Sequence, residues 1–506
     1  MSFSGTLSGE DWPYLFLENI KEFSFFPTAG SLWLVFYYQA TSKLFVEYFG
    51  LNWEIAERIL WFWPFLILSI ISSYYLTKSW IGVLIYTTNT YILMVVSGGQ
   101  MGVALAYSIA PLVIGRFIKL INSTTFLLSQ NFKFQISNFK YPIIAGLIFG
   151  IQTMFDPRIS YIIFIAVIFY FLFTLKKSLA TFLSSLLFVL LIPILIMIVI
   201  NLYWILPLLY GNIPIEHQGF KSVEGFKFLS FADFSHSISL LHPNWPENIF
   251  GKTYFLQPEF LILPIIAYFG LFFSRTKILF FSLIGLIGAF LAKGSNPPFE
   301  FINEWFFQYF PGMSMFRDSS KFYLLIVLGY SFLIPFALQK ISKKIPFGKL
   351  LPVVFILFWC ILIRHAFFGE LGGTFKTMAV PTEYIELKQH LLSTPNSTIL
   401  WIPSRQRFGF SSDSHPGISA RDILEDSDPL RMAKVISNDK GKTIYNKFKE
   451  MKIEQIIVPY DSDKELFILD RKYNDLLRDK VIIELDKTEW LIKIPKFSKS
   501  AIYKVQ

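Results

Sequence analysis

Charged residues and cysteine are both scarce in this chain. Only 16% of its 506 residues are charged, whereas a soluble protein carries about 25%. The single cysteine, Cys360, excludes an intrachain disulfide and any cysteine-based zinc site. The sequence also lacks a Walker loop, a GxGxxG loop, a zincin helix and a GxSxG elbow. These absences leave no support for the common nucleotide, zinc-protease and serine-hydrolase sites.

Apolar residues take the place of the missing charge. Hydrophobic residues make up 53% of the chain and aromatic residues 18%, and mean hydropathy is +0.49. A run of about 20 apolar residues can span a bilayer. Such runs predict an α-helical multi-pass membrane protein with about ten spans, near 57–77, 80–98, 101–121, 140–156, 159–175, 179–206, 258–274, 278–293, 321–339 and 350–367.

The basic residues indicate an orientation. With the first 50 residues outside, the inner loops hold thirteen lysines and arginines and no Asp or Glu, as the positive-inside rule expects. The net charge of +10 then comes mostly from the basic inner loops, so nucleic acid is not expected as a partner.

Three regions are predicted. Residues 1–56 form an extracytoplasmic acidic loop followed by an interfacial helix over 31–50. Residues 57–367 form the transmembrane domain, with outer loops at 207–256 and 294–318. In residues 368–506 charge density rises and long apolar runs end, which predicts a small extracytoplasmic α/β domain. We expect its strands at 397–404, 453–460, 480–485 and 490–495, and helices at 445–451 and around 466–478.

Adjacent carboxylates stand near the start of the chain, in the stretch GEDWP. Glu10 and Asp11 could supply a general base, with the second carboxylate holding a metal or a sugar hydroxyl. The alternative is a helix cap or a solvated turn. A divalent metal is left open as a cofactor, and none is assigned.

The stretch FDPR lies at the outer end of a predicted span. Pro157 should end that helix, so that Asp156 and Arg158 flank the break. Arginine suits bidentate phosphate binding. The alternative is a local Asp–Arg pair that only terminates the helix.

The outer loop 207–256 contains Glu216, Asp233 and three histidines, His217, His236 and His242. Their spacing matches no metal motif. A loop that packs on a cavity, with His242 near a substrate, explains them better.

A third outer stretch, PGMSMFRDSSKFYLL, places Arg317, Asp318 and Lys321 before a long apolar run. Helix N-termini favour anions, and two cations at this position strengthen that preference. Asp318 could orient Arg317 or cap the helix. The alternative is anchoring to lipid headgroups.

These motifs, taken in order, resemble a known family. LAKGSNPPF and PGMSMFRDSSKF, together with FDPR, HPNWPEN, WIP and IIVPY, resemble the GT-C superfamily of membrane glycosyltransferases. The similarity is to its prokaryotic arabinofuranosyltransferase-like and uncharacterised YfhO-like branches. GEDWP resembles the acidic motif of their first extracytoplasmic loop. Two features depart from the pattern. Only nine residues precede Glu10 where the family has a first helix, and Ser319 stands where the family has proline.

The resemblance implies a prokaryotic plasma-membrane enzyme. It would move a sugar from a polyprenyl-phosphate donor to a cell-envelope glycan or lipid acceptor, outside the cytosol and with inversion. Asp11 or Glu10 would be the base, and Arg317, Lys321 and Arg158 would hold the lipid phosphate. The oligosaccharyltransferase WWDYG signature is absent, so peptide N-glycosylation is not expected.

Two other functions fit the same features. A transporter of lipid-linked glycans also needs outer cations, but it should carry many polar residues within its spans, and here Asn89, Gln152 and Asn201 are the main ones. A non-catalytic membrane scaffold is the third reading.

Overall fold

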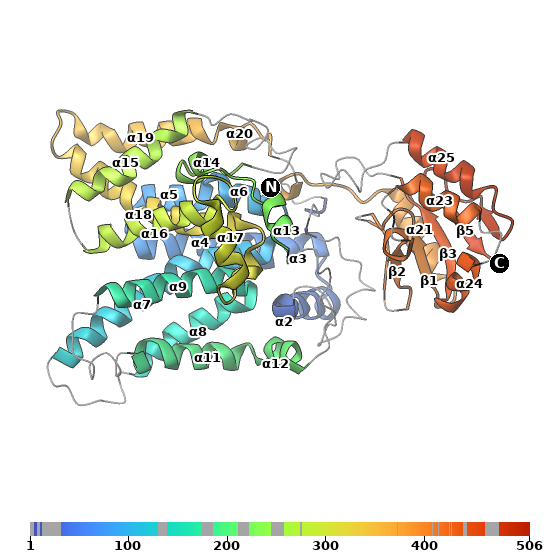
Figure 1. The fold of residues 1–506 in the computed structure, drawn as a ribbon, viewed down its shortest axis with the longest axis horizontal. Helices are drawn as coiled ribbons and strands as arrows, with labels where there is room; N and C mark the ends of the chain where they lie inside the picture. The colour runs from blue at the N-terminus through green and yellow to red at the C-terminus, as the bar shows by residue number, and fades with distance from the viewer. Residues whose placement is uncertain are drawn as a thin grey trace.

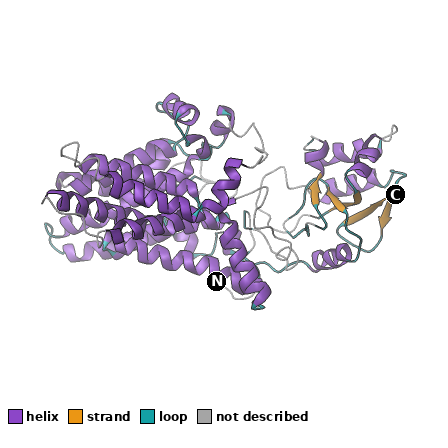
Figure 2. Cartoon of the chain, turned by 90° about the horizontal axis from the view of Figure 1, so that it is seen from below, coloured by secondary structure: helices purple, strands orange, loops and turns teal. Residues whose placement is uncertain are grey.

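A computed structural model describes most of the chain. The described residues are 5–7, 11–12, 32–129, 139–174, 186–210, 222–243, 258–273, 276–371, 373–406, 408–412, 414–424, 426, 428–438, 443–460 and 475–506. Figure 1 shows a large helical body and a smaller C-terminal domain that contains the strands. Figure 2 shows the same division from another side.

Long apolar helices build the body. The first half contains η1 (Leu32–Leu34), α2 (Val35–Gln39), η2 (Ala40–Tyr48), α3 (Trp53–Glu57), η3 (Arg58–Phe62), α4 (Trp63–Thr77), α5 (Trp80–Thr88), α6 (Thr90–Ser97), α7 (Met101–Ser129), α8 (Lys140–Phe155), α9 (Pro157–Thr174), η5 (Leu187–Leu191), α11 (Ile192–Ile200) and α12 (Leu202–Tyr210). The second half contains α13 (Val223–Phe228), α14 (Phe234–Ile238), η7 (Pro258–Leu261), α15 (Ile262–Phe269), η8 (Gly270–Phe273), α16 (Thr276–Ala292), α17 (Glu300–Tyr309), η9 (Met313–Phe316), η10 (Ser319–Phe322), α18 (Tyr323–Ser342), η11 (Gly348–Leu350), α19 (Leu351–Leu362), α20 (Arg364–Phe367) and η12 (Gly373–Phe375).

Each of the ten predicted apolar segments coincides with helical structure where it is described. Among the described residues, four helices are long and apolar enough to cross a membrane, at Trp53–Thr77, Met101–Thr124, Pro157–Thr174 and Ser319–Ser342. Two bent pairs raise the number to six, and four further apolar helices are shorter. The protein is therefore a multi-pass membrane protein, while ten spans remain a prediction.

The body packs around α7 and α18. Helix α7 lies against α4, α8 and α9, and α18 lies against α5, α15 and α16. Close helix approach in membranes uses small residues. A Cβ at Gly329 of α18 would lie 2.9 Å from the Phe281 carbonyl oxygen, and one at Gly288 of α16 would lie 2.7 Å from the Leu325 Cβ. These glycines let α16 and α18 touch along their backbones.

The C-terminal domain has a five-stranded sheet of order β2-β1-β3-β5-β4. Strands β1 (Thr398–Trp401), β2 (Gly417–Ser419) and β3 (Ile453–Val458) are parallel. Strand β5 (Ala501–Val505) pairs antiparallel with β3, and β4 (Leu491–Ile494) pairs antiparallel with β5 at the edge of the sheet. Around the sheet lie α21 (Thr382–Leu392), α22 (Ala420–Leu424), α23 (Pro429–Ser437), α24 (Thr443–Glu450) and α25 (Asp475–Leu485).

Alternate residues of β1 explain the two cores of this domain. Leu400 packs with the cluster that includes α23 and α25, whereas Ile399 and Trp401 pack with the cluster that includes α21. Strand side chains alternate between faces, so a strand covered on both faces is apolar throughout. The α/β fold predicted for this region is thus present, and its position outside the membrane remains a prediction.

One predicted strand was wrong. KVIIEL, at 480–485, lies in helix α25. Its β-branched residues favour a strand locally. Val481 and Leu485 are nevertheless four apart and both fully buried, while Ile483 is 60% exposed, which is the burial pattern of one helix face. Tertiary packing decided the outcome. The interval 466–474 lies outside the described residues.

Candidate functional site

The FDPR stretch forms the corner between α8 and α9. Asp156 ends α8 in an extended conformation and Pro157 opens α9, as predicted from the sequence. The Arg158 guanidinium holds the Asp156 carboxylate through its Nε and Nη2 atoms, and Nη2 lies 2.6 Å from Oδ2. Asp156 is buried, and the Arg158 guanidinium also lies over the Trp33 ring at 5.7 Å. The local Asp–Arg pair therefore exists, and it uses only one edge of the guanidinium.

The second element is the short 3₁₀ helix that precedes α18. Asp318 caps this helix by accepting a hydrogen bond from the Ser320 backbone N–H at 3.0 Å. Its other oxygen lies 2.8 Å from the Lys321 ammonium group, which is buried. Burial by itself would raise the pKa of Asp318. The Lys321 ammonium group more than offsets this effect and holds the pKa below its usual range. Arg317 beside it is exposed. The two cations expected from the sequence therefore differ in burial, since Lys321 is buried and Arg317 is exposed.

The third element is the end of the loop after α14. The His242 backbone N–H donates to the Thr90 hydroxyl at 2.9 Å, and this hydroxyl donates to the Leu240 carbonyl at 2.7 Å. The His242 ring packs against Tyr91 and Tyr323, with centroids 5.6 and 5.0 Å away. Two hydrogen bonds at Thr90 thus attach this loop to the start of α6, at the break that Asn89 makes between α5 and α6.

These three elements meet. The charges of Asp156, Arg158 and Asp318 all act on Tyr91, and those of Asp318 and Lys321 act on His242. The Tyr161 hydroxyl on α9 donates to the Pro311 carbonyl, and Gly312, with φ of +82°, lies against the Tyr161 ring. We call the group the polar cluster; it comprises Tyr91, Asp156, Arg158, His242, Asp318 and Lys321.

Two buried polar atoms of the cluster have no hydrogen-bond partner among the described residues. They are the Tyr91 hydroxyl and the His242 Nδ1. Leaving such groups unpaired costs about 1–3 kcal/mol each, so a site with this feature is suited to a polar ligand. Tyr91 had not been singled out from the sequence. The sequence feature that could have pointed to Tyr91 is its position two residues after Asn89, a polar residue within an apolar run.

Burial makes His242 a pH-sensitive element. Desolvation, the largest influence, lowers the pKa of His242 to about 4, partly offset by Asp318. The unfolded chain therefore binds a proton between pH 6.5 and 4 that the folded chain does not, and stability falls as pH falls through this window. Between pH 6.5 and pH 4, we expect the free energy of unfolding of the wild type to fall by about 3 kcal/mol more than that of His242→Phe. Unfolding of both proteins at pH 7 and pH 4 measures this, and parallel losses would contradict it.

Asp11 belongs to the same end of the body. Its backbone N–H donates to Gly98 at 3.0 Å, and its exposed carboxylate accepts from the Gln100 Nε2 at 3.0 Å. This places Asp11 at the start of α7. A Cβ at Gly102 would lie 3.0 Å from the Phe155 carbonyl oxygen, so α7 starts directly against the residue before Asp156. Glu10 lies outside the described residues.

A buried ion pair, not anticipated from the sequence, supports the segment that carries Asp11. Glu57 accepts hydrogen bonds from the Leu7 backbone N–H at 2.7 Å and from the Trp12 Nε1 at 3.0 Å. Arg58 lies beside Glu57 at 3.3 Å and donates to the Gly5 carbonyl at 2.7 Å. Both side chains are fully buried. The sequence feature that could have revealed this pair is WEIAERI, where charged residues interrupt an apolar stretch. The pair holds Gly5, Leu7 and Trp12 against α3.

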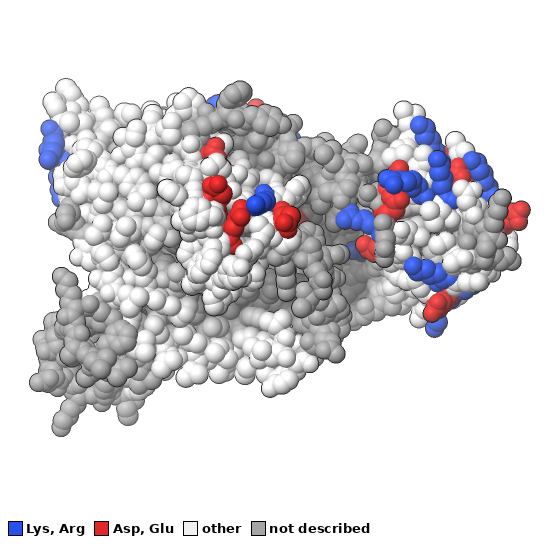
Figure 3. Space-filling model, in the orientation of Figure 1, with Lys and Arg blue, Asp and Glu red and all other residues white. Residues whose placement is uncertain are grey.

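Charge on the surface of the body is localised. In Figure 3 a small acidic group with one basic side chain lies over α13 and α17, where Lys227 pairs with Glu304 at 3.1 Å. Basic side chains without acidic neighbours lie at the left end of that view, where α18 leads to α19. No group of three or more His, Cys, Asp or Glu side chains that could hold a metal occurs in the described ranges.

Comparison with known proteins identifies the fold. No family model and no curated protein sequence matches the chain. Among solved structures, arabinofuranosyltransferase AftD from mycobacteria matches 95% of this chain with a TM-score of 0.58 and 12% identity. The oligosaccharyltransferase AglB from Archaeoglobus fulgidus, solved with an inhibitory peptide and a dolichol-phosphate, matches 90% with a TM-score of 0.50 and 12% identity. The chain spans 38% and 66% of those two chains. It therefore has the GT-C fold, as the motifs suggested.

Proposed function

We propose that this protein is a membrane glycosyltransferase that uses a polyprenyl-phosphate-linked sugar as donor. The observation that carries the proposal is the meeting of two kinds of group at one end of a GT-C fold. Asp11 offers an exposed carboxylate at the start of α7, and Arg158, Lys321 and Arg317 supply positive charge at the starts of α9 and α18. A carboxylate and cations are what transfer from a sugar phosphate needs.

The reaction is a single displacement. Asp11 takes the proton of the acceptor hydroxyl while that oxygen forms a bond to the anomeric carbon. The bond between this carbon and the phosphate oxygen breaks on the opposite side, so the anomeric configuration inverts. The electron pair leaves with the lipid phosphate, whose developing negative charge the cations stabilise. Glu10, next to Asp11 in the sequence, is the alternative base.

The cations contribute in different ways. Asp156 occupies the Nε and Nη2 edge of Arg158, which leaves the Nη1 side of the guanidinium for a phosphate oxygen. Lys321 is fixed by Asp318, so it provides a positioned charge. Arg317 is exposed, so it provides a positive charge at the surface beside this helix start. The partners Asp156 and Asp318 orient the cations, and Asp318 is not the base.

The unpartnered groups suit the sugar and phosphate oxygens. The Tyr91 hydroxyl can donate to a phosphate oxygen, and the His242 Nδ1 can bind a sugar hydroxyl. We infer that the acceptor is a cell-envelope glycan or lipid and that transfer occurs on the extracytoplasmic side, since the inner loops are basic. No metal is required by this scheme.

Transport of a lipid-linked glycan is the weaker alternative. The polar residues deep in the helices are engaged with neighbouring backbone. Asn89 donates to Ile85 and Tyr86, Gln152 donates to Ala106, and Asn201 donates to Gly150. They stabilise helix breaks and helix–helix contacts, so they are poorly placed to bind a lipid headgroup as it crosses the membrane. A scaffold without catalysis would not account for the unpaired polar atoms beside fixed cations.

Reconstituted protein tests the proposal. Purified full-length chain in proteoliposomes is offered labelled polyprenyl-phosphate sugars together with envelope glycan and lipid acceptors. We expect formation of a new glycosidic bond with inverted configuration, detected by mass spectrometry and NMR. Movement of label between leaflets without bond formation would instead assign a transporter.

A further inference from the structure

A second polar site lies at the opposite end of the helical body. A cavity of about 580 Å³ lies between the ends of α4 and α7, the start of α16 and the middle of α18. Helices α4 and α7 begin near the segment that carries Asp11 and finish at this cavity, while α18 begins at the polar cluster and extends toward it. The length of these helices therefore separates the cavity from the polar cluster.

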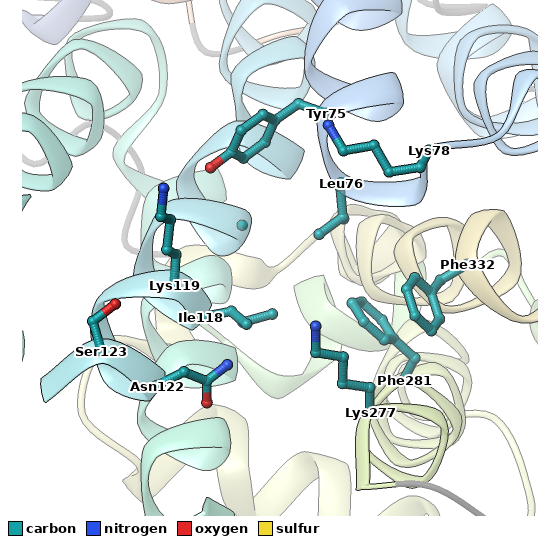
Figure 4. Close-up of a pocket in the computed structure, with 11 residues that line it drawn as sticks. Tyr75, Leu76, Lys78, Ile118, Lys119, Asn122, Ser123, Lys277, Phe281 and Phe332 are labelled. Carbon is teal, nitrogen blue, oxygen red and sulfur yellow. The ribbon is translucent and has the colours of Figure 1, made fainter. Parts of the chain in front are cut away.

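Three lysines from three elements reach the cavity. Lys78 follows α4, Lys119 lies on α7 and Lys277 lies at the start of α16, and Figure 4 shows their side chains arranged around it. None of the residues that line the cavity is acidic. No ion pair involves these lysines in the part of the chain that the structure describes. Like charges held together without a counter-ion repel one another, so this arrangement favours an anion.

An arginine packs against Tyr75, a residue that lines the cavity, and two polar side chains belong to the lining itself. The Arg116 guanidinium lies 5.1 Å from the ring centroid of Tyr75, and the Lys78 ammonium group lies 5.0 Å from the same ring. The Arg116 Nε is buried and has no hydrogen-bond partner among the described residues. Asn122 and Ser123 add hydrogen-bonding groups to the lining. These groups suit oxygens that carry negative charge.

The rest of the lining is apolar. Leu76 and Ile118 line it, together with Phe281 and Phe332, whose rings stack at 4.2 Å. A free anion uses only the lysine side of such a space, whereas a lipid uses both, with its phosphate near the lysines and its chain against the aromatic rings.

We propose that this cavity binds a phosphate group, as the headgroup of an anionic membrane lipid in the leaflet opposite the polar cluster or as free phosphate. The proposal does not depend on the transfer reaction. Under this proposal, Lys78, Lys119 and Lys277 bind a ligand in addition to their role in membrane orientation.

Lipid binding to the purified full-length chain tests the proposal. Native mass spectrometry compares retention of phosphatidylglycerol and neutral phosphatidylcholine by wild type and by the triple variant Lys78→Gln, Lys119→Gln, Lys277→Gln. We expect phosphatidylglycerol affinity to fall about 100-fold in the triple variant. A matched control, Lys340→Gln, Lys343→Gln, Lys349→Gln, removes three basic residues from the same end outside the cavity and should bind as wild type does.

Three further arms complete the test. Replacing the same three lysines by arginine keeps the charge and should keep binding, which shows that loss in the glutamine variant is not misfolding. Inorganic phosphate alone, titrated by calorimetry, identifies free phosphate as the ligand if it binds wild type and not the triple variant. The proposal would be overturned if the cavity variant and the control variant retained phosphatidylglycerol equally. It would also be overturned if wild type retained phosphatidylcholine as well as phosphatidylglycerol.

Discussion

Asp11→Asn should reduce sugar transfer by about 10²–10⁴-fold, the usual contribution of a general base. The asparagine side chain has nearly the same shape and can still accept the hydrogen bond from the Gln100 Nε2. Because the carboxylate is exposed, the substitution leaves no buried charge unpaired. The loss should therefore appear in kcat, with donor binding and thermal stability close to those of wild type.

Two further variants make this measurement decisive. Glu10→Gln tests the neighbouring carboxylate, and if only this variant loses transfer, the base is Glu10. Glu304→Gln removes a carboxylate of the α17 segment at the same end, where it pairs with Lys227, and should transfer sugar normally. Normal rates in both Asp11→Asn and Glu10→Gln would remove the proposed base altogether.

Arg158→Gln should cause a large loss of stability. Asp156 is buried, and the Arg158 guanidinium is its charge partner. Removing one member of a buried ion pair costs about 3–5 kcal/mol, because the other charge stays buried. Thermal unfolding in detergent should show a clearly lower midpoint for the variant than for wild type.

The double variant Asp156→Asn, Arg158→Gln separates structure from function. Neutralising both partners should recover most of the lost stability, since no buried charge is left alone. Transfer should remain reduced by at least about 10²-fold, because the leaving phosphate loses a fixed cation. If the double variant transferred sugar at the wild-type rate, the pair would serve only to end α8 and start α9.

The sequence identified the helical elements well because bilayer burial imposes a strong and simple pattern. Within the described residues, every apolar run that the sequence predicts as a span is helical, and the FDPR corner ended α8 at Asp156 and began α9 at Pro157 as predicted. The order of short motifs also indicated the GT-C fold correctly. The central strands β1 and β3 were found because each contains a short run of buried apolar residues, Ile399–Trp401 in β1 and Ile456–Val458 in β3.

The sequence could not identify partners that lie far apart along the chain. Lys321 is three residues from Asp318, so their pairing is local, yet only the packed structure shows that Lys321 is buried while Arg317 is exposed. Tyr91, His242 and Tyr323 come from three distant segments. Glu57 binds Leu7 and Trp12 across about 50 residues of sequence.

The difference has a physical reason. Hydropathy and helix boundaries depend on neighbouring residues, so membrane class and helix positions follow from the sequence by itself. Burial and pairing of charges depend on which helices meet. Only the tertiary structure decided that Asp156 and Asp318 hold Arg158 and Lys321 and that three dispersed lysines share one cavity. It also buries polar atoms of Tyr91 and His242 that have no hydrogen-bond partner among the described residues.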